Sequence, residues 1–249
     1  MGLIGTTIKL GLGGTAFVLL LRALSRTSAG SKVLTAAQRA AFRRLAPERS
    51  RPYLDAIFAT EDSVQGQISS LVLWALLELE TRSGTADALD VPGPSGTGDF
   101  GARDPAKWGM AMPPDGRGWG RGLWQIDYGS HREWLETHDW TDPVVNCGKA
   151  VSILIENWNY LKATPTGAGF KVKGVLIGPG GLPDPRPLGD MTAFLAMIAG
   201  YNCGRFGVLL ALAQGLDVDT YTTPFKRTNG ATGYSKEAVK LIAPIEAKL

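Results

Sequence analysis

Apolar side chains in this chain recur mostly at helical spacing, and the strongest run lies at residues 68–84, ISSLVLWALLELETRSG. Seven consecutive apolar residues, 71–77, precede two acids, Glu78 and Glu80, before the chain breaks at Gly84. Strong helix formers that are apolar nearly all round predict a buried helix. An acid at its end would lie at the rim of the core, where burial raises the pKa of a carboxyl group. The pattern therefore predicts a central helix that ends in a candidate general acid.

The rest of the chain predicts a mainly helical protein, because strand signals are few. The other predicted helices lie at residues 34–45, 53–58, 143–161, 191–201, 208–214 and 234–249. Asp142 is expected to cap the third of these, with Pro143 at its first position, and Asn202 and Gly204 to end the fourth. Residues 164–190 are rich in Gly and Pro and suggest an insertion, within which KVKGVLI favours a strand or a hairpin arm.

The N-terminal stretch, residues 3–24, is apolar and glycine-rich and is interrupted by Lys9. Its uninterrupted run, residues 10–21, is short for a membrane span but fits the core of a signal peptide. A membrane anchor is the favoured interpretation, and a cleaved signal or a docked helix are the alternatives. We therefore divide the chain into an apolar N-terminal helix (1–26), a linker with a basic helical segment (27–64) and a main domain (65–249).

Residues 84–122 are loop-like and contain many glycines, prolines and aspartates, among them Asp115. A long stretch of this kind in a compact domain is usually functional, and we expect it to form one wall of a cleft. Trp108 and Trp119 would either stack on a sugar there or pack ordinarily in the protein.

Composition gives little support to several classes of function. A net charge of +3 with interspersed signs gives little support for a nucleic-acid partner, although a basic membrane or nucleic-acid adaptor built on Arg39, Arg43 and Arg44 is a minor third class. Two histidines without a nearby Cys/His cluster argue against zinc. The two cysteines, Cys147 and Cys203, would form either one bridge or two buried thiols.

Four features follow one another in the order of a known family's motifs. The first is LLELETRSG, which ends the central helix and places Thr81 after Glu80. The second is GLWQID at residues 122–127, and the third is GYNCG at residues 200–204. Tyr234 then opens the last predicted helix.

On these motifs the chain resembles the goose-type lysozyme and lytic transglycosylase superfamily, which acts on peptidoglycan, over roughly residues 65–249. Trp124 stands where the family has Met, and Gly200 stands where it has Ala. The resemblance implies a mainly α, lysozyme-like domain with a long cleft-forming loop. It implies no cofactor and no metal.

The same resemblance assigns roles to individual residues. Glu80 would protonate the leaving oxygen of the glycosidic bond. Glu78 lies about 200° away around the helix, so it cannot face the same groove and is expected to be a surface or structural carboxylate. The implied substrate-binding residues are Thr81, Gln125, Tyr201, Asn202 and Tyr234, of which Tyr234 could also hydrogen-bond near Glu80.

The second carboxylate would decide between two reactions. Goose-type hydrolases are thought to position a water with aspartates of the second motif, and Asp127 matches one of them. Arg121 stands at the place of the other, and Asp115 is the candidate to substitute for it. Lytic transglycosylases need a single acid, because the sugar's own 6-hydroxyl attacks and leaves a 1,6-anhydro product. The sequence leaves both reactions open.

The expected function is therefore a muramidase or lytic transglycosylase that cleaves the β-1,4 bond between N-acetylmuramic acid and N-acetylglucosamine. Its expected partners are peptidoglycan strands, the membrane through the N-terminal segment, and other envelope or virion proteins. Either a bacterial envelope enzyme or a phage virion enzyme for local wall penetration has this layout. The competing class is an inert wall-binding or structural component that keeps the fold.

Overall fold

The computed structural model describes residues 33–85, 113, 119–222 and 233–249, and these residues are mainly helical, as predicted. The helices are α2 (Ala36–Leu45), the 3-10 helix η1 (Glu48–Tyr53), α3 (Leu54–Ser63), α4 (Ser70–Thr81), α6 (Tyr128–Thr137), α7 (Pro143–Lys162), α8 (Asp190–Cys203), α9 (Arg205–Ala213) and α10 (Tyr234–Glu246). The strands form two small antiparallel pairs, β1 (Gly120–Arg121) with β2 (Ile126–Asp127) and β3 (Phe170–Val172) with β4 (Val175–Ile177).

Helix α4 is the central helix that the apolar run predicts. Every residue from 70 to 79 is buried, and Glu80 is the first that is partly exposed. Ser69 caps its start by accepting a hydrogen bond from the Leu71 amide. At its end, Arg82 adopts left-handed backbone angles (φ 50°, ψ 48°), and the Ser83 amide bonds back to the carbonyl of Leu77. This abrupt stop fixes the position of the last helical turn, which carries Glu80.

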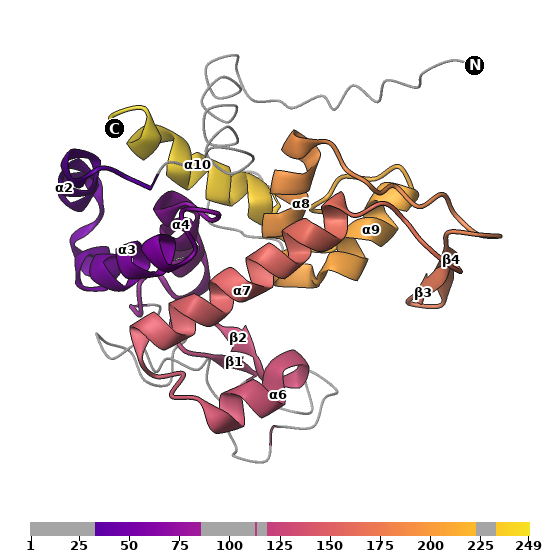
Figure 1. Ribbon diagram of the computed structural model, residues 1–249, viewed down its shortest axis with the longest axis horizontal. Coiled ribbons are helices and arrows are strands. Elements are labelled where there is room, and N and C mark those ends of the chain that lie inside the picture. The colour runs from indigo at the N-terminus through magenta and orange to yellow at the C-terminus, as the bar shows by residue number, and fades with distance from the viewer. Residues whose placement is uncertain (1–32, 86–112, 114–118, 223–232) are drawn as a thin grey trace.

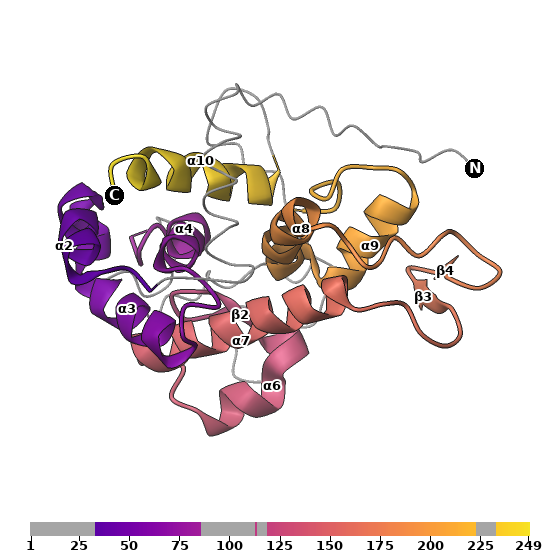
Figure 2. The same cartoon turned by 45° about the horizontal axis from the view of Figure 1, so that its top comes forward.

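Helix α7 crosses the middle of the molecule and divides it into two sides (Figures 1 and 2). Helices α3 and α4 pack against its N-terminal half, and α8 and α9 pack against the other end. Helix α10 lies across α4 and α8 and joins the two sides. Asp142 caps α7 by accepting from the amides of Val144 and Val145, and Pro143 is the first helical residue, as predicted.

The segment preceding α4 belongs to the same hydrophobic core as the rest. Phe42 of α2 is fully buried and contacts Trp74 of α4, with ring centroids 5.7 Å apart. From residue 34 onwards, the stretch predicted as a linker and basic helical segment therefore packs as part of the helical body.

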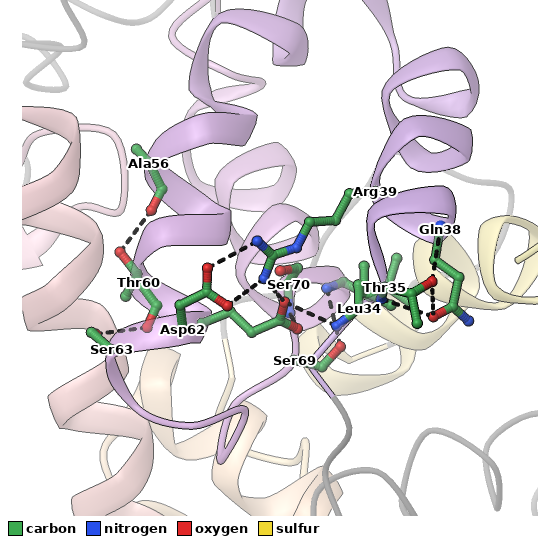
Figure 3. Close-up of polar contacts among 12 residues, drawn as sticks. Leu34, Thr35, Gln38, Arg39, Ala56, Thr60, Asp62, Ser63, Ser69 and Ser70 are labelled. Carbon is green, nitrogen blue, oxygen red and sulfur yellow. Dashed lines mark hydrogen bonds and ion pairs between the residues drawn. The ribbon is translucent and has the colours of Figure 1, made fainter.

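A buried carboxylate, Glu61, ties this segment to α4, and Figure 3 labels three of its partners, Leu34, Arg39 and Ser70. Glu61 is 1 % exposed and accepts hydrogen bonds from the amides of Ser70 (2.9 Å) and Leu34 (3.4 Å). Arg39 lies 3.1 Å from Glu61 and also binds Asp62 with two nitrogens (2.9 and 2.5 Å). The basic face of α2 is thus largely used within the protein, since Arg43 pairs with Asp55 of α3.

Two loop predictions are refined by the structure. The KVKGVLI segment does form a hairpin, β3–β4, which projects from the end of the molecule beyond α7 and α9. Helix α8 continues two residues past the predicted end, so Asn202 is helical rather than part of a terminating turn. Gly204 alone ends the helix, with a positive φ of 77° that glycine adopts without strain.

The predicted N-terminal apolar helix, residues 1–26, lies outside the described residues, as do Trp108 and most of the predicted loop at 84–122. In the part of the chain that the structure describes, no helix has the length and apolar character needed to cross a membrane.

The shared core predicts that the segment before α4 unfolds together with the rest. Phe42→Ala should lower the free energy of unfolding by about 3–5 kcal/mol, because it removes a fully buried ring. Chemical denaturation followed by both tryptophan fluorescence and circular dichroism should give one cooperative transition at lower denaturant. An unchanged main transition with a separate early one would instead mean that 27–64 folds as an appendage.

Candidate active site

The four motif regions converge at one place in the fold. The hydroxyl of Tyr234, at the start of α10, donates a short hydrogen bond to Glu80 in the last turn of α4, 154 residues earlier. The Tyr201 hydroxyl, on α8, donates to the carbonyl of Trp124 (2.6 Å). The Thr81 hydroxyl donates to the carbonyl of Leu123 (3.0 Å). These bonds join α4, the turn between β1 and β2, α8 and α10.

The two acids of α4 have different surroundings. Glu78 is 3 % exposed and accepts hydrogen bonds from Ser50 (2.7 Å) and Ser83 (2.5 Å), and it pairs with Arg49 (2.6 Å). Its role is structural, in line with one of the two predicted alternatives. Glu80 is partly exposed and faces the tyrosine side of the helix. The acid available for chemistry is therefore Glu80.

Two tyrosines, Tyr201 and Tyr234, interact electrostatically with Glu80. Burial raises the pKa of Tyr234 well above its ordinary value, and the charge of Glu80 and the bond to it raise it further. Burial and then the charge of Glu80 also raise the pKa of Tyr201. Both phenols are therefore neutral near pH 7, so Tyr234 is a proton-bearing donor that orients the Glu80 carboxyl group.

Asp219 positions Tyr234 from a distant loop. It is 8 % exposed and accepts hydrogen bonds from the Ser235 amide (2.9 Å) and the Ser235 hydroxyl (2.7 Å), so it caps the first turn of α10. A Cβ at Gly233 would lie 1.9 Å from the Asp219 Cβ, so only glycine fits there. The sequence offered no signal for this cap, because Asp219 precedes the helix by 15 residues.

The turn between β1 and β2 is held by buried contacts. Trp124 is fully buried; its indole donates to the Leu73 carbonyl (2.9 Å) and its amide donates to Asn146 (2.9 Å). A large ring with a donor group thus ties this turn to α4 and α7. Gln125 has a positive φ of 51°, and a Cβ at Gly120 would lie 2.1 Å from its side-chain oxygen. Gly120 is therefore required for Gln125 to fold over the hairpin.

A cleft of about 800 Å³ opens beside Tyr201. Its wall contains four of the predicted site residues, which are Gln125, Asp127, Tyr201 and Asn202. The volume lies within the range of about 300–1,000 Å³ that is usual for small-molecule sites. Glu80 is not among the described residues that line this cleft; its charge raises the pKa of Tyr201, which does line it.

Helix α7 contributes a cleft wall that the sequence did not reveal. Lys149, Ile153, Glu156 and Asn157 recur there at helical spacing, but the sequence could not show which face of α7 meets the cleft. Asn157 is 5 % exposed, and among the described residues its Nδ2 has no hydrogen-bond partner. A Cβ at residue 200 would lie 3.2 Å from that nitrogen, so a larger residue there would require the Asn157 side chain to shift by a few tenths of an ångström.

The predicted second carboxylate of the reaction is Asp127 or Asp115, and Arg121 stands where another aspartate was expected. Asp127 is exposed on the cleft wall and also caps α6, accepting from the Ser130 amide (2.8 Å). Arg121 is fully buried, with its guanidinium 5.0 Å from the ring centre of Tyr128, so it does not replace an aspartate at the cleft surface. Asp115 lies outside the described residues.

Two predicted substrate-binding residues have other roles. Thr81 and Tyr234 are both fully buried, so neither can touch a ligand in the cleft. Thr81 instead fixes the chain after α4, because its hydroxyl also accepts from the Gly84 amide (3.1 Å). Trp119 is partly buried and packs edge-on against Tyr128, which favours the packing role over sugar stacking.

The cysteines are free thiols, Cys147 buried and Cys203 partly exposed. Burial raises the pKa of Cys147 to about 12 and that of Cys203 to about 11, so neither is a thiolate nucleophile at neutral pH. Among the described residues, no group of three or more His, Cys, Asp or Glu side chains could hold a metal ion.

The cap that Asp219 provides predicts a larger loss of stability than the removal of an exposed carboxylate would cause. Asp219→Ala should lower the free energy of unfolding by about 1–3 kcal/mol, because it leaves the first turn of α10 without its buried acceptor. Asp55→Ala, which removes an exposed carboxylate paired with Arg43, should cost less than about 1 kcal/mol. Urea denaturation of the two variants measures the difference, and equal costs would contradict the capping role.

No family model matches the chain, and no curated protein matches it. The function must therefore be argued from the arrangement of Glu80, its two tyrosines and the cleft.

Proposed function

We propose that this protein cleaves the glycan strands of peptidoglycan as a muramidase or lytic transglycosylase with a lysozyme-like domain. The observation that carries the proposal is the hydrogen bond from buried Tyr234 to Glu80, together with a cleft lined by Gln125, Tyr201 and Asn202. The bond orients a partly exposed carboxyl group, and the cleft is large enough for a sugar. The four-motif resemblance agrees with this arrangement.

In the proposed reaction, the Glu80 carboxyl group gives its proton to the oxygen that links the two sugars. The bond from that oxygen to the anomeric carbon breaks, and positive charge develops on the sugar ring that retains this carbon. Tyr234 would orient the carboxyl group before transfer and donate a hydrogen bond to the carboxylate left afterwards. No metal or cofactor is needed for this step.

The cleft offers the polar groups that an N-acetylated sugar requires. Gln125 and Asn202 carry amide groups that can both donate and accept, and each is partly exposed on the cleft wall. Asn157 adds a buried amide on the α7 wall, and its Nδ2 has no hydrogen-bond partner among the described residues.

Asp127 is the proposed water-positioning residue if the reaction is hydrolysis. Its carboxylate lies on the cleft wall, where an exposed base can contact both solvent and ligand. In a transglycosylase the sugar's 6-hydroxyl would take the place of that water. The expected N-terminal anchor, at residues 1–26, would hold either enzyme at a membrane that faces the cell wall, or within a virion.

The two acids of α4 allow a matched test of the proposal. Glu80→Gln should lower the rate of peptidoglycan digestion by about 10²- to 10⁴-fold, because it removes the proton donor. Glutamine keeps an acceptor for Tyr234, so the free energy of unfolding should change by less than about 0.5 kcal/mol. Release of soluble fragments from purified peptidoglycan measures the rate.

Glu78→Gln is the control, and we expect it to change stability rather than the rate of digestion. It should reduce stability by about 1–3 kcal/mol, since a buried acceptor loses its charge, while turnover of the folded protein stays near the wild-type value. We expect a loss of stability near the lower end of this range, because Arg49, the ion-pair partner of Glu78, is partly exposed to solvent. Full activity in Glu80→Gln would refute the proposal.

Asp127→Asn separates the two reactions. Asparagine caps a helix about as well as aspartate, so α6 should stay folded and any change reports chemistry. For a hydrolase we expect reducing ends in wild-type digests and a loss of about 10²-fold or more in the variant. For a transglycosylase we expect 1,6-anhydro ends and an unchanged rate. Mass spectrometry of the released fragments distinguishes the two products.

A further inference from the structure

A second hollow, of about 440 Å³, lies at the base of the β3–β4 hairpin. It is lined by the end of α7, the segment that leads into β3, and the segment that follows β4. The lining residues that carry the argument are Tyr160, Ala168, Phe170, Asp184 and Arg186. No role could be assigned to this region from its residues alone, yet it forms a concave surface of ligand-binding size.

The hollow and the candidate cleft border the same aromatic cluster. Phe206, at the start of α9, lines the cleft and is 41 % exposed. Its ring centre lies 5.6 Å from that of Tyr160 and 5.7 Å from that of Phe170, and both of those rings line the hollow. A ligand that leaves the cleft over Phe206 would therefore reach the hollow without crossing a separate surface.

Guanidinium groups hold these rings in place. Arg205 lies over Tyr160, 4.6 Å from the ring centre, and Arg186 lies over the same ring at 4.4 Å. Arg186 is itself fixed by Asp184, to which it donates two hydrogen bonds (3.0 and 2.6 Å). Both side chains are about nine-tenths buried. Such stacking makes the aromatic surface rigid, which lowers the entropic cost of binding.

Charge favours an uncharged polymer over a polyphosphate. In the hollow, Asp184 neutralises Arg186. In the cleft, Lys149 and Arg205 are balanced by two carboxylates, Asp127 and Glu156. Burial and the charge of Lys149 lower the pKa of the cleft residue His131, which keeps it neutral at pH 7. Nucleic-acid grooves need a clear positive excess, and these surfaces have none.

We propose that this hollow is a distal subsite that binds an N-acetylhexosamine unit of the glycan strand, several sugars away from the bond next to Glu80. The inference rests on the proposed function and extends it, because it makes the hairpin insertion a device for selecting long strands. Short glycans would occupy the cleft alone, and longer ones would occupy both sites.

The test measures binding of two glycans to the full chain carrying Glu80→Gln, which prevents turnover. The probes are β-1,4-linked N-acetylglucosamine oligomers of three and six units, followed by isothermal titration calorimetry. The six-unit oligomer should bind about tenfold more tightly than the three-unit one, as a second contact of moderate strength would give.

Substitutions that fill the hollow should remove the tighter binding of the six-unit oligomer and leave the binding of the three-unit oligomer unchanged. Ala168→Trp and, independently, Thr166→Trp place a large ring at exposed loop positions that line the hollow. Each should lower the affinity for the longer oligomer to that for the shorter one. Lys171→Trp, on an exposed position of the same hairpin, is the matched control and should keep the difference.

The possible outcomes separate the two proposals. If Ala168→Trp and Thr166→Trp both bind the six-unit oligomer as tightly as the protein carrying Glu80→Gln alone, or if that protein binds both oligomers equally, the distal subsite is refuted while the proposed function stands. If the protein carrying Glu80→Gln alone binds neither oligomer, the proposed function fails, and the subsite fails with it. Binding of a labelled single-stranded DNA that is lost in Ala168→Trp would also overturn the inference, in favour of a nucleic-acid site.

Discussion

The hydrogen bond from Tyr234 to Glu80 is the contact on which the rest of the candidate site depends. It joins the end of the central helix to the start of the last one, and both partners are held by separate structural devices. Helix α4 is buried up to residue 79 and stops abruptly at Arg82, which fixes the position of Glu80. The cap from Asp219 fixes the first turn of α10 and with it Tyr234. A partly exposed acid is thereby oriented by contacts between two helices.

The core around α4 also contains two buried carboxylates. Glu78 and Glu61 are both nearly fully buried, and each is satisfied by hydrogen bonds and an arginine. Buried carboxylates of this kind lock the connections between helices, because loss of any partner would leave an uncompensated charge. The segment before α4 supplies Arg39 and Arg49 to these pairs, so it contributes to the geometry of the site through the core rather than by contact with ligand.

Under the proposed function, the insertion between α7 and α8 would give the site a preference for long strands. The cleft that Tyr201 lines is built from helices and a short hairpin, whereas the second hollow is built largely from this insertion. The aromatic cluster around Tyr160 and Phe206 connects them. An insertion at this point can therefore lengthen the binding surface without disturbing the helices that position the acid.

The sequence alone determined the helical class, the central helix and the acid at its end, because these follow from local periodicity, helix propensity and capping residues such as Asp142. The order of short motifs, by resemblance, also singled out Gln125, Tyr201 and Asn202. Only the tertiary structure decided which side chains are buried, and it shows Thr81 and Tyr234 fully buried and hydrogen-bonded within the protein. It alone revealed the Asp219 cap, the cleft face of α7 and the second hollow, because these depend on contacts between residues far apart in the chain, which no local pattern encodes.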